Sequence, residues 1–121
     1  MSLEKCYELI GGDLDEIINA LGSESIVQKF LLKLLDEDTH LLLTSSIEKK
    51  DYAEAFRAAH TIKGISLNLS LKRLYSVANP LTEALRHKES LDEVKVLKLY
   101  HSFKEVYDSI IKTIGEFKSS L

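Results

Sequence analysis

The stretch over residues 58–70, AAHTIKGISLNLS, decides how the rest of this chain is organised. In a helix, His60, Lys63, Gly64 and Leu67 fall at i, i+3, i+4 and i+7, so they share one face. The other sides of that helix carry small or apolar residues, namely Ala58, Ala59, Ile62, Ile65, Ser66 and Leu69. The pattern predicts a helix with an imidazole, a cation and a bare stretch of backbone together on one face.

This segment begins at a helix-start signal and follows another amphipathic pattern. Asp51 with Glu54 three residues later is typical of a capping box, so we expect a helix over residues 52–69. Before it, Ser23 can cap a pattern with apolar residues at i, i+3 and i+4, which predicts one helix over residues 24–48. The predicted stripe of that helix is Ile26, Val27, Phe30, Leu31, Leu34, Leu35, Asp38, Leu41, Leu42 and Ser45.

The N-terminal end of the chain contributes one short helix. The first residues show no clear period until Asp13, which has Glu16 three positions later and so predicts a helix start. We expect a helix over residues 13–21, closed by Gly22. Such a helix is too short to be stable alone, so it should cover one end of the core.

A further helix is expected over residues 71–87, immediately after the opening stretch. Ser70 either caps this helix or interrupts the chain before it. Pro80 lies in its middle and removes the hydrogen bond that would reach Ser76, at a cost of about 3 kcal/mol if nothing compensates. We therefore expect a kink or a break near Asn79, and favour one kinked helix over two helices.

The last pattern completes a bundle. Ser90 and Glu93 form a capping box, and apolar residues then recur at helical spacing, which predicts a helix over residues 91–117. Long amphipathic helices joined by short connections are antiparallel neighbours. We expect an all-α fold, an antiparallel up-down-up-down four-helix bundle with a short additional N-terminal helix, forming a single domain over residues 1–121.

Composition excludes several classes of function. A formal net charge of -3 provides no broad cationic surface, so nucleic acid and anionic membrane are not the expected partners. The single cysteine cannot form an intramolecular disulfide. No signal peptide is apparent, and no apolar run approaches the roughly 20 residues that span a bilayer. We expect a cytoplasmic monomer.

Three of the four histidines have ordinary explanations. His87 and His101 lie among polar neighbours and are expected on helix surfaces. Glu37 and His40 have the Glu-x-x-His spacing of carboxylate-bridged di-iron bundles, but such a site needs a second Glu-x-x-His, and the chain has none. We therefore expect no bound metal and no cofactor.

The fourth histidine, His60, has neighbours suited to phosphate chemistry. A neutral imidazole is a good nucleophile toward phosphorus near neutral pH. Lys63 would bring an ammonium beside a bound phosphoryl group and disfavour the protonated imidazole, which cannot attack. Gly64 costs about 1 kcal/mol in a helix relative to alanine, and its missing side chain would let another protein approach the imidazole.

The segment over residues 57–69, RAAHTIKGISLNL, resembles the signature of histidine phosphotransfer (HPt) domains, the intermediate carriers of multistep phosphorelays. The likeness covers nearly the whole chain. The FLLKLL run from Phe30, the KKDYA turn from Lys49 and the helix from Leu71 lie where that family has them. One departure is Ser70, where the family usually has glycine, so we expect an earlier helix end and a serine cap instead of a left-handed turn.

The resemblance implies a role for each residue of the central motif. His60 would accept a phosphoryl group on its outer ring nitrogen from the aspartyl phosphate of a receiver domain and pass it to another. Lys63 would be the phosphate-side cation and Gly64 the clearance position, with apolar residues such as Leu67 in contact with the partner. We expect the side chain of Lys63 to be exposed.

The implied protein is a phosphohistidine carrier and not a kinase, because no nucleotide-binding motif is present. Its partners would be response-regulator receiver domains and a hybrid sensor histidine kinase, and Mg²⁺ would be supplied by the receiver. The alternative is a non-catalytic helical adaptor that binds a signalling partner without being phosphorylated. A buried or inward-facing His60 would favour that adaptor.

Overall fold

The computed structural model describes residues 1–121, and all of its regular elements are helical, which confirms the all-α class. None of its helices has the length and apolar character that crossing a bilayer requires. The α-helices are α1 (Leu3–Ile10), α2 (Leu14–Leu21), α3 (Glu24–Lys33), α4 (Thr39–Glu48), α5 (Tyr52–Asn68), α6 (Lys72–Leu85) and α7 (Glu93–Ser119), and two 3-10 turns span Leu34–Asp36 and Lys88–Ser90.

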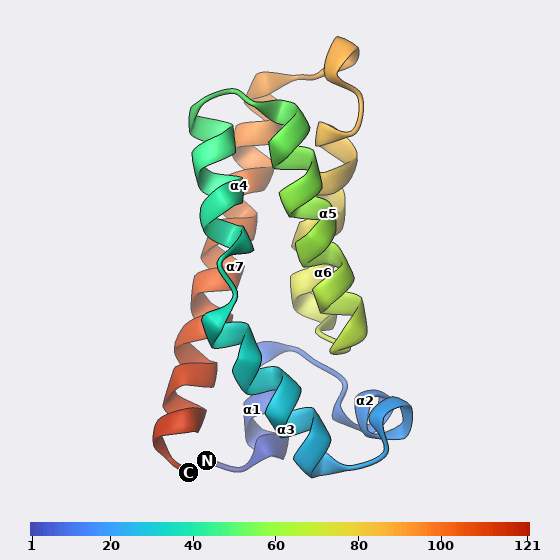
Figure 1. The fold of residues 1–121 in the computed structure, drawn as a ribbon, viewed down its shortest axis with the longest axis vertical. Coiled ribbons are helices and arrows are strands. Elements are labelled where there is room, and N and C mark those ends of the chain that lie inside the picture. Colours follow the sequence, from blue (N-terminus) through green and yellow to red (C-terminus); the bar gives the residue numbers. More distant parts are fainter.

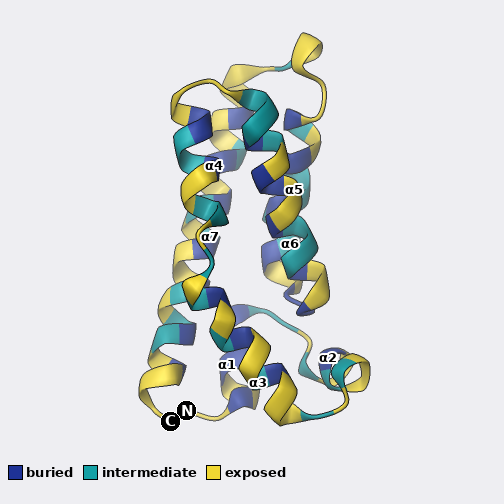
Figure 2. Cartoon of the chain, in the orientation of Figure 1, coloured by how far each residue is buried: buried dark blue, intermediate teal, exposed yellow.

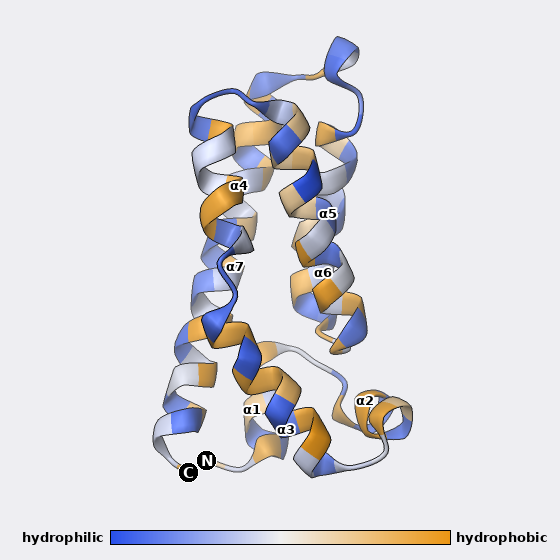
Figure 3. Ribbon diagram, in the orientation of Figure 1, coloured by the Kyte–Doolittle hydropathy of each residue, from blue (hydrophilic) through white to orange (hydrophobic).

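Helices α4 to α7 run alternately up and down and form the predicted bundle, which occupies the upper half of Figure 1. The connections at its upper end are hydrophilic (Figure 3), as solvated turns should be. Helix α7 is 27 residues long and extends below the bundle, where α1 and α3 pack on it. Both chain ends lie at the foot of the molecule (Figure 1).

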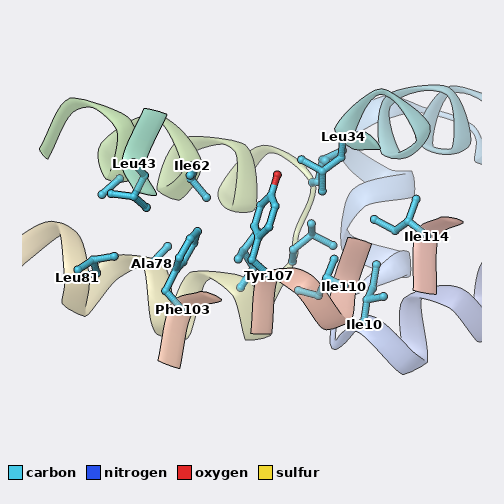
Figure 4. Close-up of a cluster of buried hydrophobic side chains, with 14 of the residues drawn as sticks. Ile10, Leu34, Leu43, Ile62, Ala78, Leu81, Phe103, Tyr107, Ile110 and Ile114 are labelled. Atoms are coloured by element: carbon cyan, nitrogen blue, oxygen red, sulfur yellow. The ribbon is translucent and has the colours of Figure 1, made fainter. Parts of the chain in front are cut away.

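One apolar core connects the two halves. In the upper half, Leu43 of α4, Ile62 of α5, Leu81 of α6 and Phe103 of α7 are buried, and Figure 4 shows them converging between the helices. Figure 4 also shows the core continuing along α7 to Ile10, Leu34, Ile110 and Ile114 in the lower half. The buried stripe of α7 therefore joins the bundle to the N-terminal helices (Figure 2).

The prediction of a single helix over residues 24–48 is wrong, because the helical structure is interrupted between α3 and α4 (Figure 1). Glu37 is extended, with φ -77° and ψ 127°, and its carboxylate accepts hydrogen bonds from the backbone N–H and the hydroxyl of Thr39. A polar side chain that bonds nearby backbone competes with helix continuation. These hydrogen bonds, led by that of the Thr39 hydroxyl, hold the pKa of Glu37 below its ordinary value.

The break also changes which residues of α4 face the core. Leu41 and Leu42 belong to the predicted apolar stripe, but their exposed fractions are 61% and 45%. Leu43 is fully buried instead. The buried positions of α4 are shifted relative to the repeat of α3, because the 3-10 turn and the extended residue between the two helices do not preserve the 3.6-residue period.

Helix α1 was not predicted. Ser2 caps it by accepting a hydrogen bond from the Lys5 N–H, and Gly11 ends it in a left-handed conformation. Its buried residues, Leu3, Cys6, Tyr7 and Ile10, follow i, i+3, i+4 and i+7. Eight residues form a marginal helix in isolation, so packing against α7 must supply most of its stability, about 1.5–3 kcal/mol for a fully buried isoleucine alone.

The turn between α5 and α6 corrects the expectation for Ser70. This residue is left-handed, with φ 53°, so serine occupies the conformation that usually selects glycine. The Leu71 N–H donates to the Ser66 carbonyl at 2.8 Å, and the Ser70 N–H donates to the Leu67 carbonyl at 3.2 Å. This pattern is a Schellman motif, and α6 begins without a side-chain cap.

We expect Ser70→Gly to raise the free energy of unfolding by about 1 kcal/mol. The left-handed conformation costs a residue with a Cβ about 1–2 kcal/mol, and glycine avoids this cost. Part of the gain is offset because glycine makes the unfolded chain more flexible and so more stable. Thermal denaturation should show a melting temperature higher by about 4 °C. The matched control is Ser109→Gly at an exposed position of α7, which should lower stability. Equal destabilisation by both substitutions would contradict the role of backbone conformation at Ser70.

Helix α6 runs through Pro80 as one helix, which the sequence favoured over two, and Ser76, whose carbonyl loses its helical partner there, is exposed to water. The start of the last helix needs correction. The cap of α7 is Asp92, which accepts from the Lys95 N–H, and not Ser90. Ser90 ends a 3-10 turn, so the helix begins two residues later than predicted.

Candidate functional site

Helix α5 presents His60 on its solvent side. Asp51 caps the helix by accepting from the Glu54 N–H at 3.2 Å. The buried face is made of small and branched residues that contact α4 and α6, namely Ala55, Ala58, Ala59, Ile62 and Ser66. Small side chains let the neighbouring helices approach closely, and the imidazole of His60 remains exposed on the other side.

The His60 ring lies against an aromatic side chain of its own helix. Phe56, one turn earlier, stacks on it with a centroid distance of 5.8 Å and an interplanar angle of 15°. The guanidinium of Arg86, the residue that follows α6, lies 5.0 Å from the centroid of the Phe56 ring. The phenyl ring therefore lies between the imidazole and a cation at the C-terminal end of the neighbouring helix.

Lys63 is less exposed than the sequence suggests. Only 18% of its side chain is accessible, and Nζ lies 3.7 Å from Oε1 of Glu83 on α6. The expectation that Lys63 would be freely exposed is therefore corrected, because α6 packs beside α5 and brings a carboxylate to it. Lys63 lies one turn after His60 on α5, so the two residues are neighbours on the helix surface.

Gly64 and Leu67 leave an open surface beyond His60. A Cβ built on Gly64 would meet no atom within 4 Å, so no packing inside this chain requires glycine there. Leu67 exposes 57% of its surface on the same face. The face thus continues from the imidazole over bare backbone to an apolar side chain.

An apolar groove begins at Leu67. It has a volume of about 630 Å³ and lies where the C-terminal end of α5 approaches α2 and α3. Its walls include Ile17 and Leu21 of α2 and Phe30 of α3, with Lys33 among the charged residues that line it. Phe30 is itself partly exposed, so the apolar surface extends from α5 toward α3.

The other histidines do not join this site. His87 and His101 are exposed, as predicted, but His87 lies beyond the end of α6 and not on a helix surface. His40 stacks on Tyr107 with a centroid distance of 4.8 Å, and burial raises the pKa of the Tyr107 hydroxyl to about 12. No group of three or more His, Cys, Asp or Glu side chains comes together in a way that could hold a metal ion.

Sequence reasoning missed three residues around His60: Phe56, Glu83 and Arg86. Phe56 precedes His60 by four residues, so helical spacing alone could have found it. No sequence spacing relates Glu83 to Lys63 or Arg86 to Phe56, because these contacts depend on how α5 and α6 pack.

Comparison with known proteins agrees with this arrangement. The family model described as Hpt domain matches residues 3–111 of the 121-residue chain. No curated protein and no solved structure shows a significant match to the chain. The matched region includes α1 to α6 and most of α7, and it contains His60 and the residues around it. The chain belongs to the Hpt domain family.

Proposed function

We propose that this protein carries phosphoryl groups between receiver domains in a phosphorelay, with His60 as the accepting residue. The observation that carries the proposal is the exposed imidazole of His60, beside Lys63 and the open surface over Gly64, in a chain of the Hpt family. A buried or inward-facing histidine would have favoured the adaptor alternative, and the exposure of His60 argues against it.

The transfer uses the lone pair of the outer ring nitrogen, Nε2. It attacks phosphorus of the receiver's aspartyl phosphate, the bond from phosphorus to the carboxylate oxygen breaks, and its electron pair leaves with the carboxylate. The other ring nitrogen keeps its proton, so the first product is a phosphorylated imidazolium that later releases this proton to water. Passing the phosphoryl group to another receiver reverses these steps.

Each neighbour of His60 has a separate task in this proposal. Lys63 supplies positive charge for the phosphoryl oxygens, where a charge-assisted hydrogen bond is strongest. Gly64 leaves room for the partner's backbone next to the imidazole. Leu67 and the groove that begins there provide apolar contact area for the receiver. Both proteins together hold the reacting atoms in line, which is the main source of catalysis in such transfers.

The receiver would supply the Mg²⁺ that phosphoryl transfer needs, in its own acidic pocket. This chain then acts as a reactant and carrier, in keeping with its family, and not as a kinase. The same surface would accept a hybrid sensor histidine kinase only through that kinase's receiver domain.

The test is incubation of the protein with a phosphorylated receiver domain and Mg²⁺, following labelled phosphate. We expect label on the chain that is labile in acid and stable in base, as phosphohistidine is. The label should return to a second, unphosphorylated receiver when one is added. Absence of label with each of several receivers would overturn the carrier function and favour the adaptor.

Lys63→Ala should slow transfer from a receiver by about tenfold and shorten the lifetime of phosphohistidine, because the phosphoryl oxygens lose their cation. Lys63 makes one ion pair of 3.7 Å with a half-exposed carboxylate, so the melting temperature should change by only a few degrees. Rapid-quench kinetics and thermal denaturation measure the two effects. Unchanged kinetics would remove the role assigned to Lys63.

A further inference from the structure

One carboxylate, that of Glu83, contacts two cations. Arg86 donates to it twice, from Nε to Oε2 at 3.0 Å and from Nη2 to Oε1 at 2.9 Å. Lys63 Nζ approaches the same Oε1 at 3.7 Å. The hydrogen bonds from Arg86, with the charges of Arg86 and Lys63, hold the pKa of Glu83 below its ordinary value.

The two contacts of Glu83 differ in strength. The contact with Arg86 is bidentate, within one turn of α6, and at hydrogen-bond distance. The contact with Lys63 crosses between helices and is longer than a hydrogen bond. Glu83 is therefore held firmly by Arg86, and its contact with Lys63 is the one that breaks more easily.

Both cations are also connected to the imidazole. Lys63 lies one turn after His60 on α5, and Arg86 lies against Phe56, which stacks on the His60 ring. A phosphoryl group on His60 would bring about one and a half to two negative charges to this cluster. It would then compete with the single charge of Glu83 for the ammonium of Lys63.

We propose that Glu83 is a positioning residue for phosphotransfer: it holds Lys63 in the unphosphorylated protein and yields the ammonium when His60 is phosphorylated. This proposal rests on the proposed function. Because Glu83 remains next to Lys63, it weakens the hold of the ammonium on the phosphoryl group. The carboxylate thereby favours onward transfer over storage of the phosphoryl group on His60.

The experiment uses phosphoramidate, a small molecule that transfers its phosphoryl group to an imidazole while its nitrogen leaves as ammonia. No receiver is involved in this reaction. The half-life of phosphohistidine is measured in the wild type, Glu83→Gln, Lys63→Ala and the double variant. Glu83→Gln should lengthen the half-life by about two- to fivefold, the range expected for loss of a competing exposed ion pair. In the Lys63→Ala background the same substitution should have no effect, because there is no ammonium to release.

The charge-matched control is Glu8→Gln, which removes a carboxylate paired with Lys5 at the C-terminal end of α1. It should leave the half-life unchanged. An unchanged half-life in Glu83→Gln, or the same change with and without Lys63, would overturn the proposal, as would failure of phosphoramidate to label His60. Chemical labelling without labelling by any receiver would instead count against the proposed function alone.

Discussion

The variant His60→Gln should take up no phosphoryl label from any receiver, while folding as the wild type does. Glutamine is a good helix former of similar length, and its amide nitrogen is not a nucleophile. The imidazole is exposed and its one aromatic contact is with Phe56, so its loss removes little packing. Labelling with a phosphorylated receiver should therefore fall to background, and circular dichroism should show the same helix content and a similar melting temperature.

The matched controls are His87→Gln and His101→Gln, which replace the other exposed histidines. Both should accept label at the wild-type rate, because neither histidine has a glycine four residues later to open the backbone beside it. His101 has a lysine three residues later, but the ammonium of Lys104 is bound to the carboxylate of Asp108. Label that persists in His60→Gln, or disappears in His87→Gln, would show that another residue is the acceptor.

The variant Gly64→Ala should be more stable than the wild type and yet transfer phosphate poorly. A Cβ at residue 64 meets no atom within 4 Å, so alanine fits the isolated protein and gains about 1 kcal/mol of helix propensity. The same methyl group would lie where the partner must approach the imidazole. A displacement of about 1 Å at the reacting atoms can slow a reaction by about 100-fold. We expect the second-order rate constant for transfer from the receiver to fall by about that factor.

Gly115 provides the control for this prediction. It also lies within a helix, α7, and a Cβ added there would meet no atom within 4 Å, so Gly115→Ala should give the same gain in stability. Its transfer kinetics should be unchanged. Phosphoramidate, which needs no protein surface, should label Gly64→Ala at nearly the wild-type rate. Equal transfer from the receiver by Gly64→Ala and the wild type would refute the clearance role.

Much of the fold follows from local patterns in the sequence. Asp13 and Asp51 cap α2 and α5 as predicted, because a cap and the N–H groups that it binds are neighbours along the chain. The apolar repeat of α7 is long enough to identify its buried face, and Phe103 and Ile110 lie on that face. The exposed position of His60 follows from the same reasoning.

Sequence patterns did not predict three features of the fold, each for its own physical reason. Helix α1 is stabilised by packing against α7, which the local sequence does not show. Its apolar residues repeat over only eight positions, which is too few to identify a helix. The break at Glu37 shifts the buried face of α4 from Leu41 and Leu42 to Leu43, which a continuous repeat cannot anticipate. Ser70 keeps the left-handed turn because the hydrogen bonds of the Schellman motif hold it there.

Some features of the candidate site were also predictable from the sequence, and others were not. The shared face of His60, Lys63, Gly64 and Leu67 follows from the sequence, because positions three, four and seven residues apart are neighbours on any helix. The pairing of Lys63 with Glu83 does not follow from the sequence and is known from the folded protein. That contact exists because α6 packs beside α5, and side-chain contacts between helices depend on their relative position and rotation, which no spacing within one helix encodes.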